Sequence, residues 1–161
     1  MKLTFAAVVC ALLFASCDSV DDHRIPSMPV RIDFPTVGDW QQYGVSAALD
    51  SRSFIKTERL PHGFPYTDMS ATGFGGVLLA CSFDNVPLAY DLSCPVEVSP
   101  TVRVSIDKDN NVARCNKCGS TYDVYRTGAP LSGPAVEKGY ALTRYRVAPG
   151  QEALQYMIVI R

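Results

Sequence analysis

The sequence has little histidine, almost no net charge and no long apolar run. Only two of its 161 residues are histidines, and the formal net charge is −1. With no basic cluster, it gives no reason to expect nucleic acid or an anionic membrane surface as a partner. The N-terminal apolar run, Leu3 to Ala15, is too short for a membrane-spanning helix, which needs about 20 residues. No Ser-His-Asp set, phosphate-binding loop or cofactor fingerprint is present, so we expect that the protein is not an enzyme.

The first residues resemble a bacterial lipoprotein signal. Lys2 precedes the apolar run, which ends in Phe14-Ala15-Ser16-Cys17, a motif similar to a lipobox. We therefore expect a signal peptide over residues 1–16, acylation of Cys17 and a lipid-anchored protein of the cell envelope, at the outer membrane. An ordinary secretory signal, with Cys17 left as a thiol, is the alternative.

A polar segment follows the expected cleavage site. Residues 17–29 are charged and contain two prolines but no apolar periodicity, which is typical of a tether. The early acids Asp18, Asp21 and Asp22 resemble the segment after the acylated cysteine in lipoproteins of Bacteroidetes-type bacteria. Residues 30–161 then have a length suited to one domain.

Apolar residues alternate with polar ones through much of this domain. The stretches "VRIDF" and "VRVSI" alternate, and so does the tail, where Leu154, Tyr156, Ile158 and Ile160 share one face. Alternation at period two with glycine and proline between segments predicts an all-β fold. The segment "GDWQQYGVSAAL" is the one place where a helical turn or two is expected.

A hairpin is predicted between two of the cysteines. Residues 102–106 and 112–114 form its strands, and Asp107 to Asn111 supply a tip rich in residues that accept positive φ. Cys94 and Cys115 lie just outside its two ends, so the hairpin should bring them together. A buried strand is expected at "VLLAC", and Asp91 marks the end of the following strand, "PLAY".

The cysteine count predicts a thiol site. Of six cysteines, Cys10 would leave with the signal and Cys17 would carry the lipid. The other four are Cys81, Cys94, Cys115 and Cys118. In an exported protein, cysteines pair, bind metal or lie buried.

Cys115-x-x-Cys118 forms one candidate metal-binding turn, and Cys94 with Glu97 offers a second. Together they resemble a zinc ribbon in which one thiolate is replaced by a carboxylate. Three alternatives stay open. The thiols could form disulfides, with Glu97 solvated at a strand edge. Cys81 fits core packing but could also be a ligand. His62 is expected at the surface but could approach the thiols from its loop.

The segment from about residue 86 to residue 147 resembles the Rieske iron-sulfur domain family. The resemblance lies in a Cys-Pro at the end of a strand, a hairpin, a Cys-x-x-x-Gly-Ser turn, an aromatic-Asp pair and a Gly-Pro-Ala loop. The matching residues are Cys94, Pro95, Cys115, Gly119, Ser120, Tyr122, Asp123, Gly133, Pro134 and Ala135. The resemblance implies an antiparallel sandwich or barrel with a small rubredoxin-like or zinc-ribbon-like metal-binding subdomain.

The chain departs from this family at the metal ligands. Val96 stands where the family has its first histidine, and Cys118 stands where it has its second. Because valine cannot bind iron, a [2Fe-2S] cluster with its usual ligation is not expected. We expect a structural site for one ion, zinc or iron, held by Cys94, Cys115, Cys118 and Glu97. The alternatives are electron transfer by a modified cluster and a cluster-free domain held by a disulfide, either with a protein partner at the Cys94/Cys118 tip.

Overall fold

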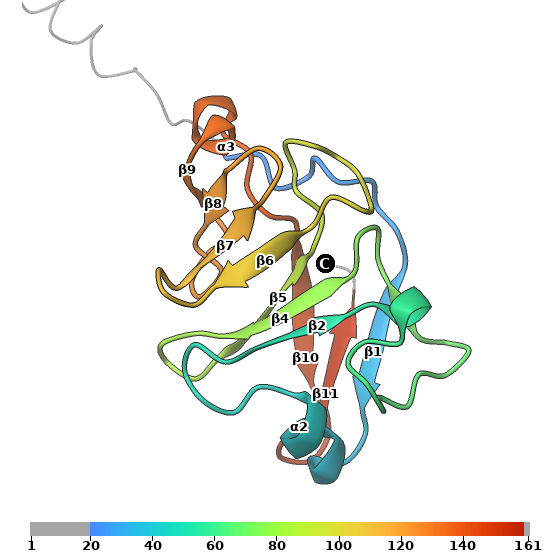
Figure 1. Cartoon of the computed structure of the whole chain (residues 1–161). Helices are drawn as coiled ribbons and strands as arrows, with labels where there is room; N and C mark the ends of the chain where they lie inside the picture. Colours follow the sequence, from blue (N-terminus) through green and yellow to red (C-terminus); the bar gives the residue numbers. More distant parts are fainter. Residues whose placement is uncertain (1–19, 160–161) are drawn as a thin grey trace, which may run out of the picture.

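The structure, a computed structural model, describes residues 20–159. These residues form two antiparallel sheets of seven and four strands with a few short helical segments. Figure 1 shows the smaller sheet, with helix α3 beside it, above the larger one. This arrangement confirms the predicted all-β fold, with a smaller sheet that carries Cys115.

The larger sheet has the strand order β2-β4-β5-β10-β11-β1-β3. Its strands are β1 (Val30–Phe34), β2 (Ser51–Phe54), β3 (Ala71–Thr72), β4 (Val77–Cys81), β5 (Pro87–Asp91), β10 (Arg144–Pro149) and β11 (Tyr156–Val159). The smaller sheet comprises β6 (Val104–Asp107), β7 (Val112–Cys115), β8 (Thr121–Tyr122) and β9 (Pro130–Ser132), in that order. The helical segments are α2 (Val37–Tyr43), η2 (Lys56–Glu58) and α3 (Pro134–Lys138).

The larger sheet rolls around an aromatic core. Alternate residues of β1 are buried, as period-two patterning requires. Phe34 lies at the centre, with its ring in edge-on contact with Trp40, Phe54 and Phe64. The two edges of the sheet approach each other, since the Lys56 amide after β2 bonds the Thr72 hydroxyl of β3 at 3.4 Å. The sheet is therefore nearly closed.

A second core lies between the two sheets and beneath the cysteines. Tyr90 and Leu78 from the larger sheet pack there with Cys94, Cys115 and Tyr122. All five side chains are at most 1 % exposed. The cysteines at issue are thus part of a packed core, so the sheets fix their positions.

Several predicted elements are found where the sequence places them. The hairpin is formed by β6 and β7, and "VLLAC" is the fully buried strand β4. Helix α2 lies in the segment expected to be helical and begins with a capping box, in which Thr36 and Asp39 bond each other's backbone amides. Gly44 ends it.

Two features differ from the sequence prediction. Leu154 does not share the face of β11, because it lies in the turn before the strand with φ at 61° and a side chain that is 39 % exposed. The Gly-Pro-Ala loop contains the short helix α3. Sequence analysis did not predict it, because a helix of five residues is too short to show an apolar periodicity.

The described part of the expected tether lies against the domain. The Asp21 amide donates to the Gly139 carbonyl at 2.7 Å, and the Ala141 amide donates to the Asp21 carbonyl at 2.9 Å. Ile25 is 5 % exposed. Asp21 therefore already contacts the domain, while Cys17 and the signal segment lie outside the described residues. Among residues 20–159, no helix has the length and apolar character needed to cross a membrane.

Candidate metal centre

Two backbone turns of the same kind hold the cysteines. In the first, the Val98 amide donates to the Cys94 carbonyl at 2.9 Å. In the second, the Gly119 amide donates to the Cys115 carbonyl, also at 2.9 Å. Val98 and Gly119 both have positive φ, 48° and 76°. Each turn thus has a cysteine first and a left-handed residue fifth; we call them the Cys94 turn and the Cys115 turn.

The fourth residue differs between the two turns. It is Glu97 in the Cys94 turn and Cys118 in the Cys115 turn. A zinc ribbon uses the first and fourth residues of two such turns as its four ligands. The backbone therefore presents two matching halves of such a site, with a carboxylate in one of the four ligand positions.

The β6–β7 hairpin joins the two turns. Val104 of β6 pairs with Cys115 of β7. On the other side of β6, the Cys94 amide donates to the Val102 carbonyl at 2.9 Å, and the Val104 amide donates to the Leu92 carbonyl at 2.8 Å. The hairpin thus holds the Cys94 turn beside the Cys115 turn, as the sequence predicted.

The three sulfurs converge. The Sγ atoms of Cys94, Cys115 and Cys118 all lie within 4.8 Å of one another, and those of Cys94 and Cys118 are 3.6 Å apart. In a tetrahedral zinc site with Zn–S bonds of about 2.3 Å, two sulfurs lie about 3.8 Å apart. The Cys94–Cys118 distance of 3.6 Å is already close to this value.

The three thiols fit a single ion better than a two-iron cluster. In a [2Fe-2S] cluster the protein ligands are divided between two irons, with two on each. Ligands of different irons lie on opposite sides of the cluster, whereas these sulfurs gather around one point. Cys118 of one turn is in contact with Cys94 of the other. That Cys94, Cys115 and Cys118 act as metal ligands stays a prediction.

The surroundings shift the pKa values of Cys94 and Cys118 in opposite directions. Burial raises the pKa of the Cys94 thiol to about 12, although the Tyr122 hydroxyl and the amides of Glu97 and Val96 act in the opposite direction. Burial also opposes ionisation of Cys118, but the hydroxyl and amide of Ser120, with the two neighbouring thiols, outweigh it and lower its pKa. Cys118 is also the one thiol of the three that is partly exposed.

Two hydroxyl groups beside the site contact the sulfurs of Cys94 and Cys118. The Tyr122 hydroxyl lies 3.5 Å from the Cys94 sulfur, and Ser120 Oγ lies 3.2 Å from the Cys118 sulfur. The Ala135 amide donates to Ser120 Oγ at 3.1 Å. Gly133 has φ at 76°, and a Cβ there would lie 2.9 Å from Ser120 Cα, so Gly133 lets the Gly133-Pro134 loop pack against the Cys115 turn. The loop thereby orients the serine hydroxyl that faces Cys118.

Glu97 has a different partner. Its carboxylate lies 2.5 Å from the Lys117 ammonium, across the gap between the two turns. It does not belong to the described group of side chains that could hold one ion, which consists of the three cysteines. This ion pair raises the pKa of Lys117. The sequence placed Glu97 in the right turn, but it offered no sign that Lys117 would hold the carboxylate.

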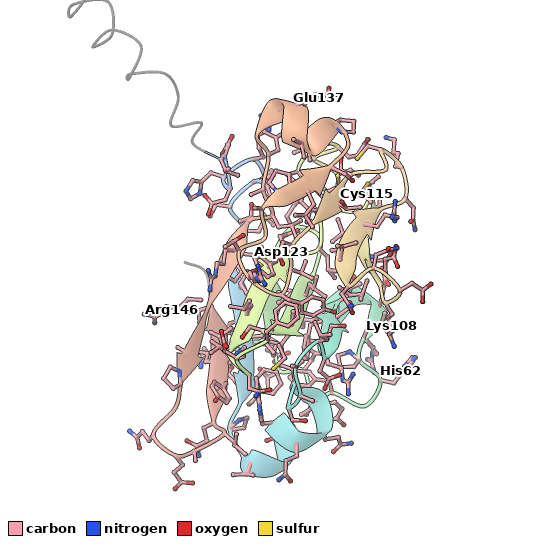
Figure 2. The ribbon with its side chains drawn as sticks, turned by 90° about the vertical axis from the view of Figure 1, so that its left-hand side faces the viewer. His62, Lys108, Cys115, Asp123, Glu137 and Arg146 are labelled. Carbon is pink, nitrogen blue, oxygen red and sulfur yellow. The ribbon has the colours of Figure 1, made fainter. Side chains whose placement is uncertain are left out.

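The other expected donors lie elsewhere. Cys81 is 1 % exposed and belongs to the aromatic core of the larger sheet, which agrees with the packing role expected for it. His62 is an exposed residue, and Figure 2 shows it far from the labelled Cys115. Val96 is partly buried against the core that contains Cys94 and Cys115. The four described cysteines are free thiols.

Sequence analysis missed the role of Asp91. This fully buried carboxylate accepts hydrogen bonds from the amides of Gly75 and Ser93, at 3.1 and 2.7 Å, and from the Tyr145 hydroxyl at 2.5 Å. Ser93 immediately precedes Cys94, so Asp91 fixes the start of the Cys94 turn. An acid at the end of an apolar strand was the available signal, because a buried carboxylate needs such partners.

Comparisons with known proteins give a structural similarity but no sequence match. No protein-family model matches the chain, and no curated protein sequence does. Among solved structures, the chain is similar to a protein from Mycobacterium tuberculosis whose title describes an NADH-dependent nitrite reductase small subunit. The identity is 10 %, the TM-score is 0.44, and the match covers 83 % of this chain and 97 % of that chain. A similarity of this degree assigns neither an activity nor a ligand.

Proposed function

We propose that this chain is a divergent member of the Rieske family that holds one metal ion through Cys94, Cys115 and Cys118. The observation that carries the proposal is the convergence of three sulfurs from two matching turns. Zinc or iron suits such a site if a fourth donor is supplied. Glu97 occupies the corresponding fourth position of its turn and would become that donor by leaving Lys117.

The proposed role of the ion is structural rather than catalytic. Cys94 and Cys115 are 0 % exposed and lie in the core between the two sheets. An ion bound there links the two turns, so its binding free energy adds to the stability of the fold. No substrate-activating role is proposed for it.

Metal analysis combined with thermal unfolding tests this proposal. The protein purified without added metal should contain about one bound metal ion per chain. A chelator should lower its melting temperature, and Cys118→Ser should do the same and abolish the response to chelator. Cys81→Ala is the matched control, because its thiol lies in the other core and the metal content should stay unchanged.

Other outcomes of this experiment would favour the alternatives. Iron with acid-labile sulfide and a reducible absorbance band would replace the single-ion proposal with electron transfer by a modified cluster. Protein without metal, whose melting temperature falls with a reductant and not with a chelator, would favour the disulfide-held domain. In that case Cys94 and Cys118 are the candidate pair, because their sulfurs are 3.6 Å apart.

We also propose that the domain is tethered to the outer membrane through an acylated Cys17, on the lipobox-like motif alone. A stable anchor needs more than one acyl chain. Cys17→Ser should therefore move the protein from the membrane fraction to the soluble fraction of the envelope. Unchanged membrane fractionation would contradict the anchor.

A partner protein would dock at the Cys94/Cys118 tip, near which Leu131 and Val136 are 52 % and 48 % exposed.

A further inference from the structure

We propose that the three-sulfur site takes a soft monovalent ion, Cu(I), in three-coordinate geometry, while Lys117 holds Glu97 outside the coordination sphere. This inference rests on the proposed function, because it presumes that the three thiols bind one ion. It goes further by naming the ion from the number and kind of donors that the structure brings together.

The donor set is the first argument. The described side chains that could hold one ion at this place are three thiols. Thiolates are soft ligands and suit Cu(I), whereas zinc sites are almost always four-coordinate. Cu(I) accepts three sulfur donors as a complete set. Zinc at the same place would lack one donor.

The Lys117–Glu97 ion pair is the second argument. Zinc would obtain its fourth protein donor from Glu97, but this carboxylate already has a partner at 2.5 Å. The Glu97 side chain is only 17 % exposed, so its ion pair with Lys117 is partly shielded from water. Moving Glu97 to a metal ion would therefore break a charge-assisted hydrogen bond that water replaces only in part. Cu(I) binding leaves the ion pair intact, and the pair therefore favours Cu(I) over zinc.

Charge is the third consideration. Three thiolates and Cu(I) carry a formal charge of −2, so the complex requires nearby positive charge or hydrogen-bond donors. Lys117 lies between Cys115 and Cys118 in the Cys115 turn and supplies an ammonium charge there. The Tyr122 hydroxyl lies 3.5 Å from the Cys94 sulfur, and Ser120 Oγ lies 3.2 Å from the Cys118 sulfur. These groups stabilise thiolate charge without adding a hard ligand.

The test measures both metals on the reduced, metal-free protein under anaerobic conditions. Cu(I) affinity is measured by competition with bicinchoninate, and zinc affinity by competition with a chromogenic chelator. X-ray absorption at the copper edge counts the sulfur donors. We expect three sulfurs and no oxygen, and a loss of Cu(I) affinity of about tenfold or more for each of Cys94→Ser, Cys115→Ser and Cys118→Ser.

Variants of the ion pair separate the two metals. Lys117→Met frees Glu97 and should raise zinc affinity relative to Cu(I) affinity by about tenfold. Lys117→Arg, which keeps the pair, and Lys108→Met, which removes an exposed charge on the β6–β7 hairpin, should leave that ratio unchanged. Glu97→Gln should leave Cu(I) affinity unchanged, because the carboxylate is not a ligand.

The outcomes distinguish the two levels of the proposal. If the protein binds neither of these metals nor iron, the proposed function fails and this inference fails with it. If zinc binds but copper shows an oxygen donor, or Glu97→Gln weakens Cu(I) binding as much as a cysteine variant does, only the three-coordinate assignment is overturned. Cu(I) affinity unaffected by Cys94→Ser would also overturn it, because the Cys115-x-x-Cys118 pair would then bind copper alone.

Discussion

The Cys94 turn and the Cys115 turn follow one backbone path with different side chains. Both close with an amide-to-carbonyl bond of 2.9 Å, and both place their fifth residue at positive φ. In the Cys115 turn the fourth and fifth residues are Cys118 and Gly119, which suit a metal-binding turn. In the Cys94 turn they are Glu97 and Val98, and a β-branched residue at positive φ is strained. The difference shows that the surrounding structure imposes the turn.

The source of that constraint is visible on both sides of the Cys94 turn. Asp91 binds the Ser93 amide before it, and the Cys94 amide is bonded to Val102, just before β6. These bonds fix where the turn begins, and the buried Cys94 side chain fixes which way it faces. A strained conformation persists only when its surroundings overdetermine it. The Cys94 turn thus adopts the same backbone conformation as the Cys115 turn although its own sequence does not favour it.

Restoring the missing thiol gives the largest expected effect. Glu97→Cys would place a fourth sulfur at the position that matches Cys118 and complete a four-cysteine zinc site. Zinc affinity should rise by about a hundredfold or more, because a closed tetrahedral set replaces an incomplete one. Competition with a chromogenic zinc chelator measures this.

Glu97→Gln is the matched control for that prediction. It breaks the ion pair with Lys117 but adds no sulfur, so it isolates the effect of losing the pair. If Glu97→Cys binds zinc no more tightly than Glu97→Gln, the two turns are not equivalent halves of one site, and the comparison between them fails.

The sequence predicted the framework of this site better than its details. The cysteine spacing, the hairpin and the Asp-Asn tip are local patterns, and they were sufficient to predict that Cys94 and Cys115 would meet. The Lys117–Glu97 pair could not be predicted, because it depends on the relative position of two turns 20 residues apart. The same limit applies to the contacts of Asp91, whose partners come from three separate segments of the chain.

Two sequence predictions about short segments differ from the structure, and each difference has a cause in the local backbone. Leu154 continued the alternating pattern of β11, but a turn with positive φ intervened before the strand. Residues 21–25 were polar enough to predict a tether, yet backbone bonds from Asp21 join them to the segment after α3. Backbone pairing of this kind leaves little trace in side-chain composition, which is the property that the sequence patterns report.

Exchanging the fifth residues of the two turns should change the free energy of unfolding by an intermediate amount. The two substitutions should act in opposite directions. Gly119→Val should lower the free energy of unfolding by about 2 kcal/mol, because valine is strained at positive φ. A Cβ at Gly119 would meet nothing within 4 Å, so a clash of this atom does not contribute to the loss. Val98→Gly should raise stability by about 1 kcal/mol, since it removes the same strain at some cost in chain entropy. Urea unfolding of the metal-free proteins measures both; two changes of the same sign would contradict the equivalence of the turns.

The smallest expected effect concerns the hairpin that joins the turns. At its tip the Asp107 carboxylate accepts bonds from the amides of Asp109 and Asn110, each at 3.2 Å, and from the Asn110 side chain at 2.9 Å. Asn111 at the end of this tip has φ at 53°, a conformation that asparagine tolerates. The tip therefore depends on one carboxylate for most of its side-chain bonds.

These bonds make the contribution of Asp107 dependent on pH. The side chain and amide of Asn110 lower the pKa of Asp107 below its ordinary value, and Arg114 adds to this. Because the folded-state pKa is depressed, the stabilisation is present above the unfolded-state pKa and is lost as the pH falls through the folded-state value. Asp107→Asn should therefore lower the melting temperature slightly near pH 7, and the difference from the wild-type protein should vanish in acid. Melting curves of both proteins across pH 2 to 7 measure it, and a difference independent of pH would show that the carboxylate charge does not stabilise the tip.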